Sequence, residues 1–477
     1  MSKESEKKIE FTDNKNDDKT VSEIDKDDSN IINNIIKKDS SSEDKNIIKH
    51  KSVIDDVIHI MFLGVGASSL SIAKVPYYIS LILTFIFILV IGIINIFSYY
   101  TLIDIIDETK NKGKKNIKND KREKKEKDKR KDFYDDLCKA LNIFNIPFII
   151  CEIIIHQILI YRSLGGIVNI IGEFNYDSVF MFLSDTYWKE LSMKFVVNII
   201  ICLLLLCPLC LKIDPKAIES FPKIGFNIIL FIVLGVFLQF FYYFIVYCKT
   251  ERDYRDLSIY PNKIESISKS FQSLAIFFYC FSGHNYFFNK IPMEKELKKP
   301  EIRRKEFRLA NILNMFIYLI FSCLGFLSVP KDAVDIVTEK KRFWDKDIIM
   351  TISRILLLPF CTFKIIINFD KLKNIFFYNK EKKFNKLLNA LFVYVTLLFT
   401  GTCASLYQNI VGYITIIGGF FVPFTTFLIP HIKLKQHIQK EYKRDFQNLR
   451  ISFGVFLCLL GITGGILGIN DIFKGDL

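Results

Sequence analysis

Blocks of about twenty consecutive apolar residues constrain this chain more than any other feature. They recur along 477 residues, of which 50% are hydrophobic. A helix of roughly 20 apolar residues crosses a hydrocarbon core about 30 Å thick. The blocks are too long for strands and lack the alternation of a membrane barrel, so they predict an all-α polytopic membrane protein. We expect about 11 transmembrane helices, near 55–75, 77–104, 142–171, 193–211, 223–248, 270–289, 308–330, 347–369, 386–405, 407–432 and 451–473.

Two segments differ in composition from these blocks. Residues 1–52 are charged and polar, so we expect a disordered cytosolic tail without a cleavable signal peptide. Residues 53–477 make up the expected transmembrane domain, and a lysine-rich insert interrupts it at 107–133.

Lysine and arginine are divided unevenly between the alternating loops. The loops on the side of the N-terminal tail hold about 36 of them, and the opposite loops hold about 12. Because positively charged loops remain in the cytosol, the N-terminus is predicted to be cytosolic. The basic loops also explain the net charge of +14, so no nucleic-acid partner is expected. The bilayer is the expected environment.

The sequence contains no constellation typical of an enzyme. Its eleven cysteines are scattered without metal-ligand spacing, and the one CxxC motif, Cys207 to Cys210, ends an apolar run. A nucleotide loop, a zinc cluster and paired catalytic carboxylates are all absent from the sequence. We therefore expect no catalytic activity, no cofactor and no metal.

The first apolar block is interrupted near its middle by Gly64-Val65-Gly66-Ala67-Ser68-Ser69. Each of the two glycines weakens a helix by roughly 1 kcal/mol relative to alanine. Hydrocarbon tolerates an opened backbone only where protein covers it or where it lines a watery cavity, and secondary transporters use such breaks as substrate sites. A small-residue packing face between ordinary helices explains the same residues equally well.

The sixth block carries a second interruption, Phe281-Ser282-Gly283-His284. A serine, a glycine and a histidine inside an apolar run offer a hydroxyl group, an opened backbone and an imidazole. Breaks in the first and sixth blocks predict two inverted five-helix repeats plus one extra helix, with the site between the repeats. For His284 alone, a satisfied histidine at a helix end is the alternative.

Ionisable residues at membrane depth are costly, so each is a functional candidate. His59 precedes the first break, and Glu152 and His156 lie four residues apart in the third block, on one helix face. A carboxylate and an imidazole together can carry a proton, so these three residues are the proton-coupling candidates. The alternative is a structural ion pair between Glu152 and either Arg354 or Lys364.

Three stretches resemble the amino acid/auxin permease family of eukaryotic amino acid transporters. They are Gly64 to Ser71, Phe281 to His284 followed by Glu296-Leu297-Lys298-Lys299-Pro300, and Val411-Gly412-Tyr413 running to Leu428-Ile429-Pro430. The resemblance implies a transporter domain with the leucine-transporter type of inverted repeat. It also implies that an amino acid substrate is held by the two unwound helices, at Gly64, Val65, Gly66, Ala67, Ser68, Phe281, Ser282, Gly283 and His284.

Three residues depart from the family's pattern. Ser71 stands where the family usually has proline, Gly166 stands where many members have an acidic residue after Gly165, and Ile60 stands where sodium-coupled members commonly have asparagine. The last departure favours protons over sodium as the coupling ion.

The sequence thus predicts a proton-coupled secondary transporter that moves amino acids toward the cytosol by alternating access. It would lie in the plasma membrane or in an acidic vacuole or lysosome-like organelle. An amino acid sensor and an uncoupled facilitator or channel of the same fold are the alternatives, and a polytopic membrane enzyme is a more distant one. Glu152 facing the site would favour cationic substrates, whereas Phe62, Tyr279 and Phe281 near the breaks would favour large apolar ones.

Overall fold

The computed structural model describes ten stretches of the chain, namely 53–111, 120–171, 186–212, 215–249, 267–283, 300–328, 338, 348–377, 386–437 and 441–474. The chain divides into two units at residue 55, and the elements below belong to residues 55–477 apart from the first two residues of the initial helix. Every element in the described stretches is a helix, as the apolar blocks predict. The predicted tail at 1–52 and residues 112–119 of the insert lie outside them.

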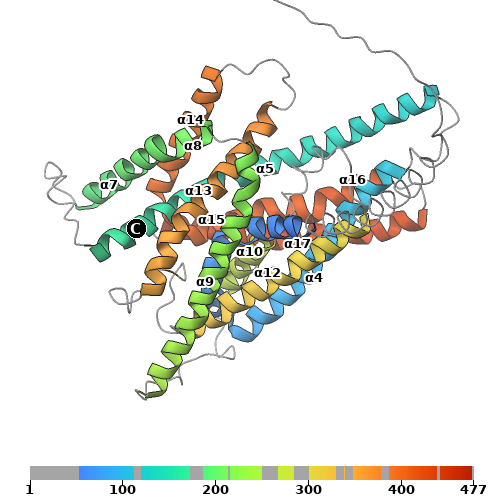
Figure 1. Ribbon diagram of the computed structural model, residues 1–477. Helices are drawn as coiled ribbons and strands as arrows, with labels where there is room; N and C mark the ends of the chain where they lie inside the picture. The colour runs from blue at the N-terminus through green and yellow to red at the C-terminus, as the bar shows by residue number, and fades with distance from the viewer. Residues whose placement is uncertain are drawn as a thin grey trace, which may run out of the picture. The chain divides into compact units, whose positions relative to one another are not determined.

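Figure 1 shows the helices, coloured from the N-terminus to the C-terminus. A helix over Val53–Gly64 is followed by α2 (Ala67–Ser71), η1 (Ile72–Lys74), α3 (Val75–Ile79), α4 (Leu81–Asn111), α5 (Asp120–Ile171), α7 (Thr186–Ile200), η2 (Ile201–Leu206), α8 (Cys207–Lys212), α9 (Pro215–Lys249), α10 (Ile267–Cys280), α12 (Pro300–Ser328), α13 (Ile348–Phe377), α14 (Lys386–Leu406), α15 (Ile410–Ile416), η7 (Ile417–Phe421), η8 (Phe424–Leu428), α16 (Ile429–His437) and α17 (Glu441–Lys474).

Within the described stretches, nine helices are long and apolar enough to cross a membrane. A tenth span is formed if Val53–Gly64 and Ser68–Ile79, which meet at an angle of 53°, count as one broken helix. The remaining predicted span, 270–289, is represented by the 14 residues of α10; its continuation from residue 284 lies outside the described residues. The chain is therefore an all-α, multi-pass integral membrane protein.

The boundary between the first two spans differs from the prediction. We expected it at Pro76, but Pro76 lies in the first turn of α3, where a proline without an N–H group costs no hydrogen bond. The chain turns instead at Ser80, whose φ of 81° lies in the left-handed region. The Ser80 hydroxyl accepts from the Leu83 N–H group at 3.4 Å, and its carbonyl accepts from the Thr84 hydroxyl at 2.7 Å. These bonds start α4.

Small residues allow the last helix to pack closely. Helix α17 lies against α10, α15 and η7, and it can be followed beside α10 and α15 in Figure 1. A Cβ added at Gly418 of η7 would stand 1.8 Å from the Ala275 carbonyl oxygen of α10, and one added at Gly464 of α17 would stand 2.4 Å from the Phe271 carbonyl oxygen. Close approach of backbones through glycine is typical of helix packing in membranes.

Candidate functional site

The first span breaks where the two glycines predict a break. The initial helix ends at Gly64, the chain bends through Val65 and Gly66, and α2 begins at Ala67 with Gly66 as its N-cap. The last carbonyls of a helix have no partners within that helix, and here other helices supply them. Lys364 Nζ of α13 donates to the Leu63 carbonyl at 3.1 Å.

A tyrosine of α12 connects the two breaks. The Tyr318 hydroxyl lies 2.9 Å from the Gly64 carbonyl oxygen in the first span and also within hydrogen-bond distance of the Cys280 carbonyl oxygen at the end of α10. It has one proton, so it can donate to one of these carbonyls at a time. The stretches at 64–68 and 281–283, more than two hundred residues apart in the sequence, therefore meet around one side chain.

Glu152 of α5 is the centre of a buried polar network. Its Oε1 accepts from the Tyr279 hydroxyl of α10 at 3.1 Å, and its Oε2 accepts from Asn368 Nδ2 of α13 at 2.7 Å. Lys371 Nζ in turn donates to Asn368 Oδ1 at 3.3 Å. The network thus links α5, α10 and α13.

His156 and Lys364 both lie against the second glycine of the break. A Cβ added at Gly66 would stand 3.4 Å from Lys364 Nζ and 4.0 Å from His156 Nε2. The Lys364 ammonium also lies 4.6 Å from the centre of the Phe62 ring, which is within cation–π range. His156 lies one helix turn after Glu152 on α5, and its imidazole faces the opened backbone of the first span.

The other candidates lie elsewhere. His59 Nδ1 is 2.9 Å from the Asp55 carbonyl oxygen of its own helix. Arg354 Nε donates to the Thr338 carbonyl at 2.7 Å and Lys364 Nζ donates to the Leu63 carbonyl at 3.1 Å, so both cations proposed as ion-pair partners of Glu152 hold backbone carbonyls. His284 lies outside the described residues, as do residues 296–299 of the loop that followed it in the family motif.

Tyr318 and Asn368 were not among the residues predicted to form the site. Both are fully buried or nearly so, and Asn368 carries a signal that could have been used, because a polar amide at membrane depth needs a partner. Tyr318 carries no such signal, since tyrosines are abundant in this chain.

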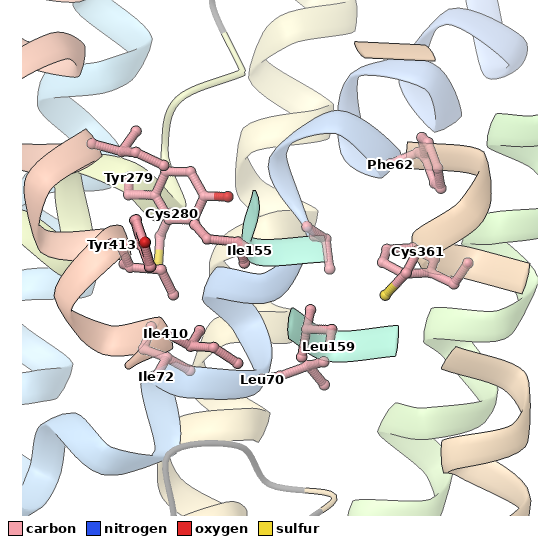
Figure 2. Packing of buried hydrophobic residues seen from close by; sticks show 14 of the residues in the cluster. Phe62, Leu70, Ile72, Ile155, Leu159, Tyr279, Cys280, Cys361, Ile410 and Tyr413 are labelled. Carbon is pink, nitrogen blue, oxygen red and sulfur yellow. The ribbon is translucent and has the colours of Figure 1, made fainter. Parts of the chain in front are cut away.

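The residues of the two breaks are buried among apolar side chains. Figure 2 shows side chains of the first span, α5, α10, α13 and α15 gathered here, including Ile155, Tyr279 and Cys361. Val65, Ser68, Phe281 and Ser282 are all buried. These four side chains are therefore closed off from solvent.

A family model described as transmembrane amino acid transporter protein matches residues 49–468, a range that includes both breaks and the Glu152 network. No curated protein matches the chain.

Proposed function

Because the chain belongs to the transmembrane amino acid transporter family, as its three motif stretches predict, we propose that it is a proton-coupled carrier that moves amino acids toward the cytosol. An amino acid transporter is what the family match supports directly. The proton coupling, the direction and the alternating-access mechanism are our proposals.

The observation that carries the substrate site is the meeting of two helix breaks around Tyr318. An opened helix leaves N–H and C=O groups that can bind the carboxylate and ammonium groups of an amino acid. The proposed site consists of Gly64, Val65, Gly66, Ala67 and Ser68 from the first span, Phe281, Ser282 and Gly283 from the second break, and His284 on the strength of the family motif. Burial of its described members is what a carrier requires, because the substrate must be closed off from one side before it is released to the other.

The proposed coupling residues are Glu152 and His156, because they lie beside the first break. A proton that binds the Glu152 carboxylate changes its hydrogen bonds with Tyr279 and Asn368, which belong to two different helices. Protonation could in this way alter the packing of α10 against α13. His59 is a weaker candidate, since its imidazole bonds to its own helix.

The structure also bears on the charge of the substrate. The Glu152 oxygens already accept two hydrogen bonds, and the Lys364 ammonium stands beside Gly66. A second positive charge close to the Lys364 ammonium would be repelled by it. We propose neutral amino acids as the substrate class rather than cationic ones.

A matched pair of glycine variants tests the site. Gly66→Leu would place a side chain against Lys364 and His156, whereas Gly165→Leu adds one where nothing lies within 4 Å of a new Cβ. Purified proteins in liposomes would be supplied with the twenty labelled amino acids. We expect Gly66→Leu to lose uptake and Gly165→Leu to keep it. Unaltered uptake by a folded Gly66→Leu protein would remove the first-span site.

A further inference from the structure

The imidazole of His156 is held so that one nitrogen faces the first break. The side chain is 1% exposed, and Nδ1 lies 2.6 Å from the Glu152 carbonyl oxygen. A carbonyl can only accept, so Nδ1 carries the proton and, in the neutral ring, Nε2 is an acceptor. Among the described residues Nε2 has no hydrogen-bond partner. This buried, unpartnered acceptor lies 4.0 Å from the point where a Gly66 Cβ would stand.

A cation faces the same point from another helix. Lys364 Nζ is 3.4 Å from the position of a Gly66 Cβ. The ammonium has three N–H groups, one of which donates to the Leu63 carbonyl at 3.1 Å. The Phe62 ring at 4.6 Å and the Phe360 ring at 5.9 Å place the ammonium among aromatic rings rather than in water. An anion that reached it would make a charge-assisted hydrogen bond, which is stronger than a neutral one.

We propose that His156 and Lys364 together recognise the zwitterionic head group of an α-amino acid beside Gly66. The substrate carboxylate accepts a hydrogen bond from Lys364 Nζ, and the substrate ammonium donates one to His156 Nε2. Glycine at position 66 is needed because a Cβ would fill the space between the two partners. This inference rests on the proposed function and adds side-chain recognition to the backbone groups of the breaks.

This arrangement gives Glu152 and His156 of α5 different roles. The His156 acceptor binds substrate only while Nε2 is unprotonated, so of the two proposed coupling residues Glu152 is the one that carries the proton while substrate is bound. The Glu152 oxygens bind Tyr279 and Asn368, which belong to α10 and α13, so protonation of Glu152 affects the contacts between helices.

The test uses ligands that lack one charge at a time. Binding of the twenty standard L-amino acids to the full-length protein in detergent would be compared with binding of their amides, which lack the carboxylate, and their N-acetyl derivatives, which lack the ammonium. A site that hydrogen-bonds a group strongly disfavours ligands without it, because its own buried partner is left unpaired. We expect the wild type to bind the free amino acid at least about tenfold more tightly than either derivative.

Three variants separate the two contacts. We expect Lys364→Met to lose the preference over the amide and His156→Phe to lose the preference over the N-acetyl derivative. Lys373→Met is the matched control, because this lysine of α13 donates to the Cys210 carbonyl at 3.0 Å; both preferences should remain. Melting of each variant shows whether it is folded.

Either of two results would overturn the proposal. One is a wild type that binds the amide or the N-acetyl derivative as tightly as the amino acid, which requires no variant to fold. The other is a folded Lys364→Met or His156→Phe protein that keeps both preferences. Head-group preference without any transport in liposomes would overturn the carrier but support this site, whereas absence of amino acid binding would overturn both.

Discussion

A double-mutant cycle can test whether the Glu152 carboxylate and the Lys364 ammonium interact as buried charges. The two singly substituted proteins are Glu152→Gln and Lys364→Met, and the third protein carries both changes. The side chains keep their approximate volume, so each change removes mainly charge and hydrogen-bonding capacity.

The size of the effect follows from the contacts. Glutamine retains one acceptor oxygen where Glu152 uses two, so either Tyr279 or Asn368 loses its acceptor. An unsatisfied buried donor costs about 1–3 kcal/mol, and a buried charge without its partner costs about 3–5 kcal/mol. The Glu152→Gln protein, which keeps the Lys364 ammonium, should therefore lose about 3–5 kcal/mol of unfolding free energy. If Glu152 and Lys364 interact as charges, the double variant should lose about 2 kcal/mol less than the sum of the two single variants.

The unfolding free energies would be measured by titrating each protein in mixed micelles with a denaturing detergent. A coupling near 2 kcal/mol supports the buried charge pair beside the first break. Effects that add to within about 0.5 kcal/mol would refute the reasoning, because independent sites behave in that way.

Three glycine substitutions give further expectations. Gly66→Ala places a Cβ in ordinary contact range of its neighbours, so melting should change little while amino acid binding weakens about tenfold or more; unchanged affinity would contradict this. A Cβ at Gly225 would stand 2.0 Å from the Phe62 ring, so Gly225→Ala should cost about 1–3 kcal/mol of stability and lower uptake, and equal melting would contradict it. A Cβ at Gly418 would stand 1.8 Å from the Ala275 carbonyl oxygen. Because a backbone atom cannot move away as a side chain can, the melting temperature of Gly418→Ala should fall further than that of Gly225→Ala.

The fold class could be predicted because it depends on local composition. Apolar blocks of membrane length appear directly in the sequence, and so do the glycines that open the first span at residues 64–66. The boundary at Pro76 was wrong because proline is compatible with both a helix break and a first helical turn. The left-handed serine that makes the actual turn, Ser80, carries no comparable signal.

The site was only partly predictable because its contacts join distant parts of the chain. The pair of Glu152 and His156 follows from helical spacing, and their shared helix does place them beside the first break. That Lys364 holds the Leu63 carbonyl, and that Tyr318 connects the two breaks, depends on how α12 and α13 pack against the first span. Spacing within one helix contains no information about such packing.

The central claim is that a proton gradient drives amino acid accumulation through this protein. The direct measurement is the internal concentration of labelled amino acid in sodium-free liposomes, with an acid exterior and with a protonophore as control. Liposomes also contain protein facing both ways, so accumulation is compared between right-side-out and inverted preparations selected by protease sensitivity. We predict concentrative uptake that the protonophore abolishes. Equilibration of the amino acid at the same level with and without the proton gradient would contradict coupling and indicate a facilitator. Binding without any uptake would indicate an amino acid sensor.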